Sequence, residues 1–221
     1  MVKPRLREIL NLLDSSRDGS SVYTTNDLQE RILHEIGALK EPEGKWKLHR
    51  NERVELALKA VSLGAEVESV VNRMNWKDFE GMVTSILVEH GFKCTESFRR
   101  RGNLEIQGME IDVIGLRGNR IVSIDAKMWG VRKYKSSALK SAAEKQKMRT
   151  ELLCGLLDRL SAKLDGLERK KFTLSPILVT WLVEDVEFSD GVPIVPVFKL
   201  NSFLMSFESY DDLTVRFECE R

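Results

Sequence analysis

The chain has 221 residues, of which 42% are hydrophobic and 31% charged, and its formal net charge is +1. These values are ordinary for a globular protein and allow one good-sized domain, or a small domain attached to a medium one. Because no run of about 18 apolar residues occurs and the N-terminus lacks the apolar centre of a signal peptide, we expect a cytoplasmic protein without a membrane association.

The first elements suggest a small helical module over about residues 1–70. Helical spacing runs from Pro4 to Leu13, and Thr24 or Thr25 is the expected cap of a second helix. A short strand at 46–48 and a helix over about 51–62 follow. This order resembles a winged helix, but eleven Lys and Arg stand against twelve Asp and Glu, which is not the basic excess of a DNA-reading module. A helical cap or a dimerisation unit is the alternative.

A helix is predicted to begin after Asn75, the expected N-cap, with Asp78 near the third helical position. Its apolar stripe ends at Gly91, a residue typical of a helix C-terminus. Glu80 lies at the margin of this stripe, where its carboxylate can reach inward or remain in solvent.

The remaining elements predict an α/β protein with a central mixed sheet flanked by helices. Strand-forming segments cover 93–98, 104–107, 109–116 and 120–129, and a long helical region covers about 135–170. The run 176–183 is typical of a central buried strand. The prolines in the strand at 192–198 favour a position near the edge of the sheet. Asn201 is the expected cap of a short helix over 203–207, and a final strand lies near 213–219.

Cysteine usage points to no crosslink. Cys94, Cys154 and Cys219 are odd in number and far apart, which fits neither a disulfide framework nor the paired spacing of a zinc site. We therefore expect three reduced thiols in the core.

The two strands over 109–116 and 120–129 carry charged residues within an apolar pattern. A two-residue turn at 118–119 pairs Arg117 with Arg120, and the same count places Asp112 opposite Asp125. It also places Glu110 opposite Lys127, so that all four charged side chains share one face, while apolar residues occupy the other.

Like charges opposite each other destabilise a pair of strands, so the repulsion between Asp112 and Asp125 must be offset. Partial protonation, the adjacent Lys127 and a divalent cation are the three alternatives. Two carboxylates with a nearby backbone carbonyl, that of Ala126, suit Mg²⁺ or Mn²⁺. An exposed face with solvated charges is the purely structural interpretation.

Positive charge is concentrated around this hairpin. Residues 93–149 contain fourteen Lys and Arg against six Asp and Glu, so the rest of the chain is net negative. A polyanion is the natural partner of such a region, unless these residues form only a solvated surface. The candidate nucleic-acid-binding residues are Arg99, Arg100, Arg101, Arg132, Lys133 and Lys135.

The order and spacing of four short motifs resemble the PD-(D/E)XK nuclease superfamily, and within it the Mrr-like restriction-endonuclease and archaeal Holliday-junction-resolvase-like branch. The motifs are WKDFE at 76–80, GF at 91–92, MEIDVIG at 109–115 and IDAK at 124–127. The resemblance covers about residues 72–200 and implies a restriction-endonuclease-like domain over 71–221.

The resemblance also implies roles for the charged residues. Asp112 and Asp125 would hold Mg²⁺ or Mn²⁺ together with the backbone carbonyl of Ala126, Lys127 would orient or activate water, and Glu80 would complete the site. Two residues depart from the founding motif: isoleucine stands before Asp112 where that motif has proline, and Asp125 replaces the commoner glutamate.

These observations favour a metal-dependent DNA endonuclease. A DNA-binding or scaffold protein on the same fold is the first alternative, and a regulator that uses the N-terminal module as a winged helix is the second. The form of the nucleic-acid substrate is left open. Because nucleases that cut both strands commonly pair two sites, a homodimer is also left open.

Overall fold

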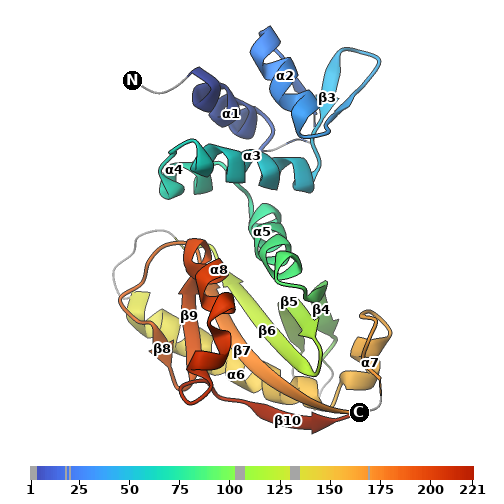
Figure 1. The fold of residues 1–221 in the computed structure, drawn as a ribbon, viewed down its shortest axis with the longest axis vertical. Helices are drawn as coiled ribbons and strands as arrows, with labels where there is room; N and C mark the ends of the chain where they lie inside the picture. Colours follow the sequence, from blue (N-terminus) through green and yellow to red (C-terminus); the bar gives the residue numbers. More distant parts are fainter. Residues whose placement is uncertain (1–3, 18, 20, 103–107, 130–134, 169) are drawn as a thin grey trace. The chain divides into compact units, whose positions relative to one another are not determined.

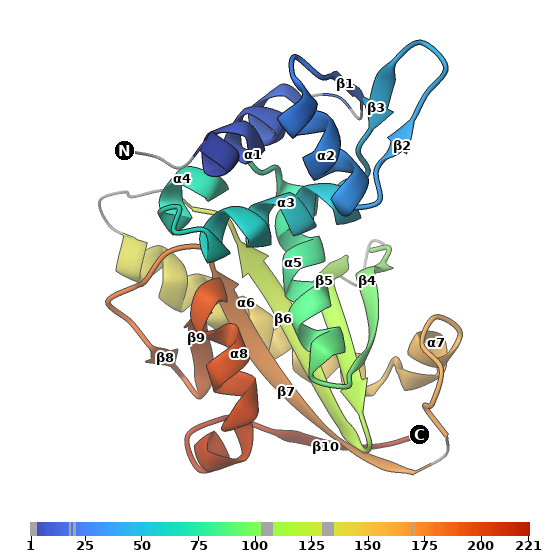
Figure 2. The ribbon, with the colours of Figure 1, turned by 45° about the horizontal axis from the view of Figure 1, so that its top comes forward.

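The computed structural model describes residues 4–17, 19, 21–102, 108–129, 135–168 and 170–221 (Figures 1 and 2). The chain divides into two compact units, Met1–Met82 and Val83–Arg221. The boundary expected after residue 70 stays a prediction. Within the described residues, no helix is long and apolar enough to cross a membrane.

The first unit combines helices with a small three-stranded sheet. Its elements are α1 (Pro4–Ser15), β1 (Ser21–Tyr23), α2 (Asp27–Glu35), β2 (Leu39–Lys40), β3 (Lys45–Lys47), α3 (Arg50–Ser62), α4 (Val67–Val71) and the start of α5 (Trp76–Glu89). The sheet is antiparallel in the order β1-β3-β2, so β2 and β3 form a hairpin beside β1. Trp46 on β3 is fully buried and anchors this sheet in the core.

Helix α2 begins as expected, but its cap is different. The N-cap is Asn26, whose side chain accepts a hydrogen bond from the backbone N–H of Gln29. The expected caps, Thr24 and Thr25, were wrong. Thr25 instead donates its backbone N–H to the side chain of Gln29, and so belongs to the turn before the helix.

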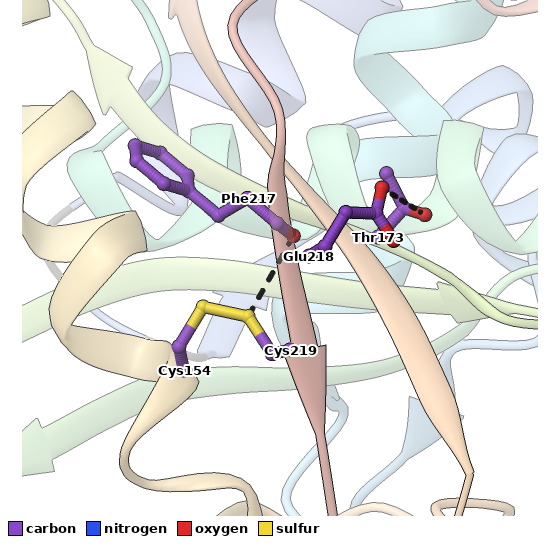
Figure 3. Close-up of a disulfide and its surroundings, with 5 residues drawn as sticks. All are labelled: Cys154, Thr173, Phe217, Glu218 and Cys219. Carbon is purple, nitrogen blue, oxygen red and sulfur yellow. Dashed lines mark hydrogen bonds between the residues drawn. A yellow bond between two sulfur atoms is a disulfide. The ribbon is translucent and has the colours of Figure 1, made fainter.

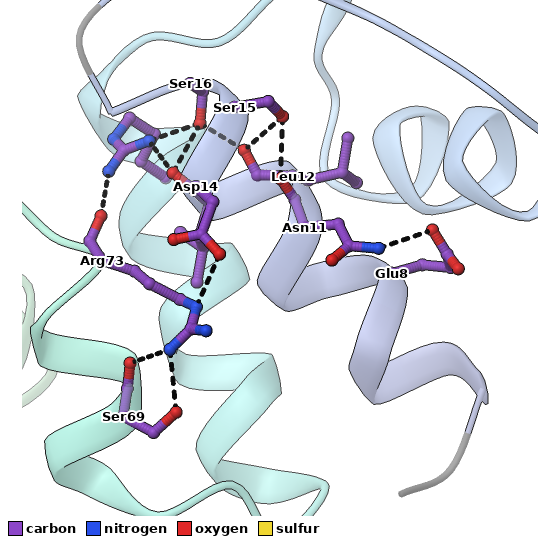
Figure 4. A network of polar contacts seen from close by, with 10 residues as sticks. Glu8, Asn11, Leu12, Asp14, Ser15, Ser16, Ser69 and Arg73 are labelled. Carbon is purple, nitrogen blue, oxygen red and sulfur yellow. Dashed lines mark hydrogen bonds and ion pairs between the residues drawn. The ribbon is translucent and has the colours of Figure 1, made fainter.

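A buried ion pair connects α3 with the start of α5. Arg53 Nε lies 2.9 Å from Asp78 Oδ2, and both side chains are almost fully buried. The guanidinium also donates to the carbonyls of Leu13 and Arg73 and to Ser16 Oγ, so it joins the end of α1 to the segment before α5. Figure 4 shows the neighbouring polar contacts, in which Arg73 binds Asp14 and Ser69.

Helix α5 begins as the sequence predicted. Asp78 donates its backbone N–H to Asn75 Oδ1 at 3.0 Å, and Asn75 donates its own to Asp78 Oδ2 at 2.9 Å. This reciprocal pair satisfies two backbone donors at the helix start. The carboxylate of Asp78 thus serves the cap and the ion pair with Arg53 together.

The second unit is built on a seven-stranded mixed sheet. After the end of α5, its elements are β4 (Lys93–Arg100), β5 (Met109–Arg117), β6 (Arg120–Lys127), α6 (Lys135–Cys154), α7 (Leu157–Ser161), β7 (Lys171–Thr180), β8 (Phe188–Ser189), β9 (Val192–Pro196), α8 (Val197–Met205), η1 (Phe207–Tyr210) and β10 (Phe217–Glu220). The strand order is β4-β5-β6-β7-β9-β8, and β10 pairs with the first half of β7. The expected α/β class, with a central mixed sheet flanked by helices, is confirmed.

Strands β6, β7 and β9 are parallel, so their carboxyl ends meet at one edge of the sheet. Lys127, Thr180 and Pro196 align there in register. Helix α6 covers one face and α8 the other, as Figures 1 and 2 both show. The end of α5 lies on the face opposite α6, because Leu87 contacts the position of Gly115, whereas Ser123 on the other face binds Gln146 of α6.

Several expected elements differ from the structure. The helical region over 135–170 is broken after Cys154 into α6 and α7, although most of its leucines do pack into one core cluster on the sheet. The strand at β9 is not the outermost one, because the two-residue β8 pairs with it through Phe188 and Pro193. Asn201 caps no helix: α8 begins four residues earlier and encloses it. The strand expected over 104–107 lies outside the described residues.

The prediction of three reduced thiols was wrong. Cys154, the last residue of α6, forms a disulfide with Cys219 of β10, as Figure 3 shows. Their Cα atoms lie 5.4 Å apart although 65 residues separate them in sequence. Only the pairing of β10 with β7 under the end of α6 brings them together, which residue spacing does not reveal. Cys94 is the free cysteine.

Candidate active site

The candidate site is built at the open end of the β5–β6 hairpin. The turn at 118–119 is formed as predicted, with Gly118 at φ +64°, a conformation that glycine adopts without steric cost. The predicted register is confirmed from Arg117–Arg120 to Val113–Ile124. The paired register ends there, one pair before Asp112.

Asp112 reaches β6 through its side chain. The backbone N–H of Ala126 donates to Asp112 Oδ2 at 2.8 Å, and both residues are buried. A carboxylate thus takes the position of a backbone acceptor where the register of the two strands ends. The sequence analysis assigned the Ala126 carbonyl to a metal, whereas the contact that the structure describes at Ala126 is made by its amide.

Asp125 lies between two cations. Lys127 Nζ is 2.7 Å from Asp125 Oδ2, and Arg149 Nη1 on α6 is 3.0 Å from Asp125 Oδ1. The Asp125 carboxylate is almost fully buried, whereas the Lys127 and Arg149 side chains are 22% and 33% exposed. Both basic side chains are therefore partly exposed to solvent while they pair with a buried carboxylate.

These contacts explain how Asp112 and Asp125 coexist. Asp125 is paired with one ammonium and one guanidinium, and the Asp112 carboxylate accepts the Ala126 amide. The adjacent lysine, one of the three expected alternatives, does contact one of the acids, Asp125. Arg149 adds a second cation that the sequence analysis did not single out.

Helix α6 is fixed to the sheet beside this site. Its buried residues recur at helical spacing, but two of them, Gln146 and Thr150, are polar. The Gln146 amide donates to the backbone O and to Oγ of Ser123, each at 2.8 Å, and Thr150 Oγ1 donates back to the Gln146 carbonyl. Polar residues within the buried stripe of a helix were the sequence signal that could have indicated this side of the site. The contacts of Gln146 with Ser123 hold α6 against β6 and so keep Arg149 close to that strand.

The donor set suits a hard divalent cation. Asp125 lies near the carboxyl end of the parallel strand β6, a common position for ligand sites in α/β proteins, and Asp112 lies near the start of the antiparallel strand β5 beside it. In the part of the chain that the structure describes, no three His, Cys, Asp or Glu side chains gather as a group that could hold a metal. The two aspartates would thus share such an ion with water or substrate oxygens, beside the two cations that already contact Asp125.

Glu80 belongs to the first unit. It lies on α5, is buried, and its Oε2 is 2.6 Å from Lys77 Nζ. Because Asp112, Asp125 and Lys127 belong to the second unit, the participation of Glu80 in a common site stays a prediction.

The candidate nucleic-acid-binding residues are described in part. Arg99 is exposed on β4 and pairs with Glu110 of β5, with Nη2 2.6 Å from Oε1. The pairs described between β5 and β6 end at Val113–Ile124, so the arrangement of Glu110 opposite Lys127 stays a prediction. Arg100 ends β4 and Arg101 is exposed just beyond it. Arg132 and Lys133 lie outside the described residues, and Lys135 begins α6.

Comparison with known proteins gives one relative. No family model matches the chain. An uncharacterized protein of Archaeoglobus fulgidus is 30% identical over 137 residues, which cover 62% of this chain and 95% of that protein. The chain belongs to the family of this archaeal protein. Membership of this family does not indicate an activity, because that relative is uncharacterized.

Three solved structures show weak similarity, and the chain spans about half the length of each. Protein VC1899 from Vibrio cholerae is 12% identical, with 96% of this chain and 52% of that protein covered and a TM-score of 0.36. Protein AF1548, of unknown function, is 22% identical, with 56% and 51% covered and a TM-score of 0.27. Can2 from Sulfobacillus thermosulfidooxidans, solved with cyclic tetra-adenylate, is 11% identical, with 91% and 50% covered and a TM-score of 0.32.

Proposed function

We propose that the chain is a nuclease that hydrolyses phosphodiester bonds in DNA and depends on Mg²⁺ or Mn²⁺. The observation that carries the proposal is the buried Asp125 between Lys127 and Arg149, beside a second buried aspartate, Asp112, on the neighbouring strand. The acid and lysine spacing and the resemblance to the Mrr-like and resolvase-like branch of PD-(D/E)XK nucleases support the same activity.

The proposed reaction needs an attacking water, stabilisation of charge on the phosphate and help for the leaving oxygen. A divalent ion held by Asp112 and Asp125 would supply Lewis acidity and a more acidic water. Lys127, partly exposed beside Asp125, can donate a hydrogen bond to that water or to a phosphate oxygen as negative charge develops. Arg99, Arg100 and Arg101, with Lys135 at the start of α6, would hold the nucleic-acid backbone without reading its sequence.

A DNA-binding protein without cleavage is the second candidate. It is favoured by the balance of charges in the described site, where Lys127 and Arg149 occupy both oxygens of Asp125. In that case the acids would only position the two basic groups towards phosphate.

The purified chain with Mg²⁺ or Mn²⁺ should be tested on linear, supercoiled, branched and single-stranded DNA and on RNA. We expect cleavage of at least one DNA form, and none by Asp112→Asn, which keeps an acceptor for the Ala126 amide but removes the charge. Calorimetry should show Mn²⁺ binding that the same variant loses. DNA binding without cleavage of any substrate would favour the second candidate.

A further inference from the structure

Arg149 pairs with one of the two carboxylate oxygens of Asp125 that a metal ion could use. It reaches Asp125 Oδ1 from α6 at 3.0 Å, while Lys127 holds Oδ2. A divalent cation bound to Asp125 would lie beside these two groups, and charge repulsion would favour the displacement of one of them. Lys127 lies two residues away on the same strand, whereas the Arg149 side chain comes from another element and is the more exposed of the two.

A guanidinium and a divalent ion on the same carboxylate also repel each other. At a separation of a few ångströms in a partly buried site, this repulsion favours release of the guanidinium. Because hydrogen bonds between Gln146 and Ser123 fix α6 against β6, the backbone of Arg149 stays close to the site when its side chain moves. The released guanidinium remains within reach of whatever binds beside Asp125.

Arg149 also suits a phosphate. A guanidinium presents its N–H donors in a planar fork that matches two phosphate oxygens, an arrangement that the ammonium of lysine lacks. A phosphodiester bound for cleavage would bring negative charge to the position that the guanidinium enters on leaving Asp125.

We infer that Arg149 exchanges partners: it pairs with Asp125 before metal binding, and it binds the phosphodiester of the substrate once a metal ion has taken its place. The inference rests on the proposed nuclease function and adds to it a substrate-binding residue. It couples the two ligands, because DNA gains the Arg149 contact only when the metal has released it.

The first test measures Mn²⁺ binding by calorimetry in the absence of DNA. Arg149→Gln removes the competitor, so its affinity for Mn²⁺ should rise by roughly tenfold. Arg149→Lys, which keeps one positive charge, should stay within about threefold of the parent. Lys147→Gln is the matched control: it removes one positive charge two residues away on α6, where Lys147 pairs with Asp190, and should change the affinity by less than about twofold.

The second test measures binding of a short fluorescent DNA duplex, without a divalent ion and with Ca²⁺ in place of Mn²⁺. Arg149→Gln should bind like the parent without a divalent ion and roughly tenfold more weakly with Ca²⁺. A merely structural role for Arg149 would weaken DNA binding equally under both conditions, and that result would overturn the inference.

The outcomes separate the inference from the function on which it rests. If the parent binds no Mn²⁺, the proposed metal-dependent nuclease fails. If the parent binds Mn²⁺ and Arg149→Gln binds it with unchanged affinity, the metal site stands and the exchange is wrong. An equal gain in Lys147→Gln would likewise contradict it, because the effect would then come from net charge alone.

Discussion

At the scale of single residues, the described site is held together by contacts of side chains. Asp112 accepts the Ala126 amide where the paired register of β5 and β6 ends, and Asp125 is held by Lys127 and Arg149. The period-2 pattern and the glycine turn were enough to predict the register of the hairpin. They could not predict Arg149, because its contact with Asp125 depends on how α6 packs on the sheet.

Cys94 gives a prediction at this scale. Burial, reinforced by the charge of Glu96, raises the pKa of its thiol to about 12, against about 8.5 for an unperturbed cysteine. The folded protein should therefore react very slowly with iodoacetamide at pH 8, and rapidly once denatured, because the thiolate is the nucleophile. Mass spectrometry of the alkylated protein measures both rates.

The same shift has a consequence for stability. The folded state holds the Cys94 proton more tightly than the unfolded state does, so this contribution is fully present below about pH 8.5 and is lost as pH rises towards 12. Fast alkylation of the folded protein at pH 8 would show that the pKa of the Cys94 thiol is not raised.

At the scale of elements, an ion pair and a disulfide join segments that are distant in sequence. The first is the buried pair Arg53–Asp78. Arg53→Met leaves the Asp78 carboxylate buried without this partner, and should lower the free energy of unfolding of the first unit by about 3–5 kcal/mol. Urea denaturation monitored by circular dichroism measures it.

The control for Arg53 is Arg73→Met. Arg73 pairs with Asp14, but both side chains are partly exposed, so its ion pair should contribute no more than about 1 kcal/mol. Equal losses in the two variants would contradict the assignment of Arg53 as the principal crosslink of this unit.

The second crosslink is the disulfide Cys154–Cys219 between α6 and β10. Thiol titration of the denatured, unreduced protein should detect one thiol, and three after reduction. Because the bond closes a loop with a sequence separation of 65 residues, reduction should also destabilise the folded protein by about 2–4 kcal/mol. Detection of three thiols before reduction would contradict the disulfide and support the prediction that all three cysteines are reduced.

Helix boundaries show the limits of sequence reasoning at this scale. The cap of α5 was predicted because Asn75 and Asp78 satisfy each other locally. The start of α8 was not, because no side chain caps it: Pro196 is the N-cap, and Asn201, which looked like a cap, lies in the helix interior. Local capping chemistry is readable from sequence, whereas a helix that begins directly after a buried strand is positioned by packing.

At the scale of the whole molecule, the fold class followed from the order of strand and helix patterns, and the segregation of charge predicts how DNA would bind. Residues 93–149 carry an excess of eight positive charges. DNA affinity should therefore fall steeply with salt, and replacing Arg99, Arg100 and Arg101 by Gln should weaken binding and reduce the salt slope by up to about 3. Fluorescence anisotropy over a salt series tests this, and a salt-insensitive complex would argue against phosphate contacts.

We propose that the site at Asp112, Asp125 and Lys127 performs the chemical step. The most direct test is the single-turnover cleavage rate of Lys127→Ala with Mn²⁺, on a DNA substrate that the parent cleaves, beside Lys147→Ala as the control. We expect Lys127→Ala to keep DNA affinity within a few-fold and to cleave on the order of a hundredfold or more slowly, as when one preorganised donor is removed, while the control cleaves normally. Cleavage by Lys127→Ala at the parent rate would contradict the account.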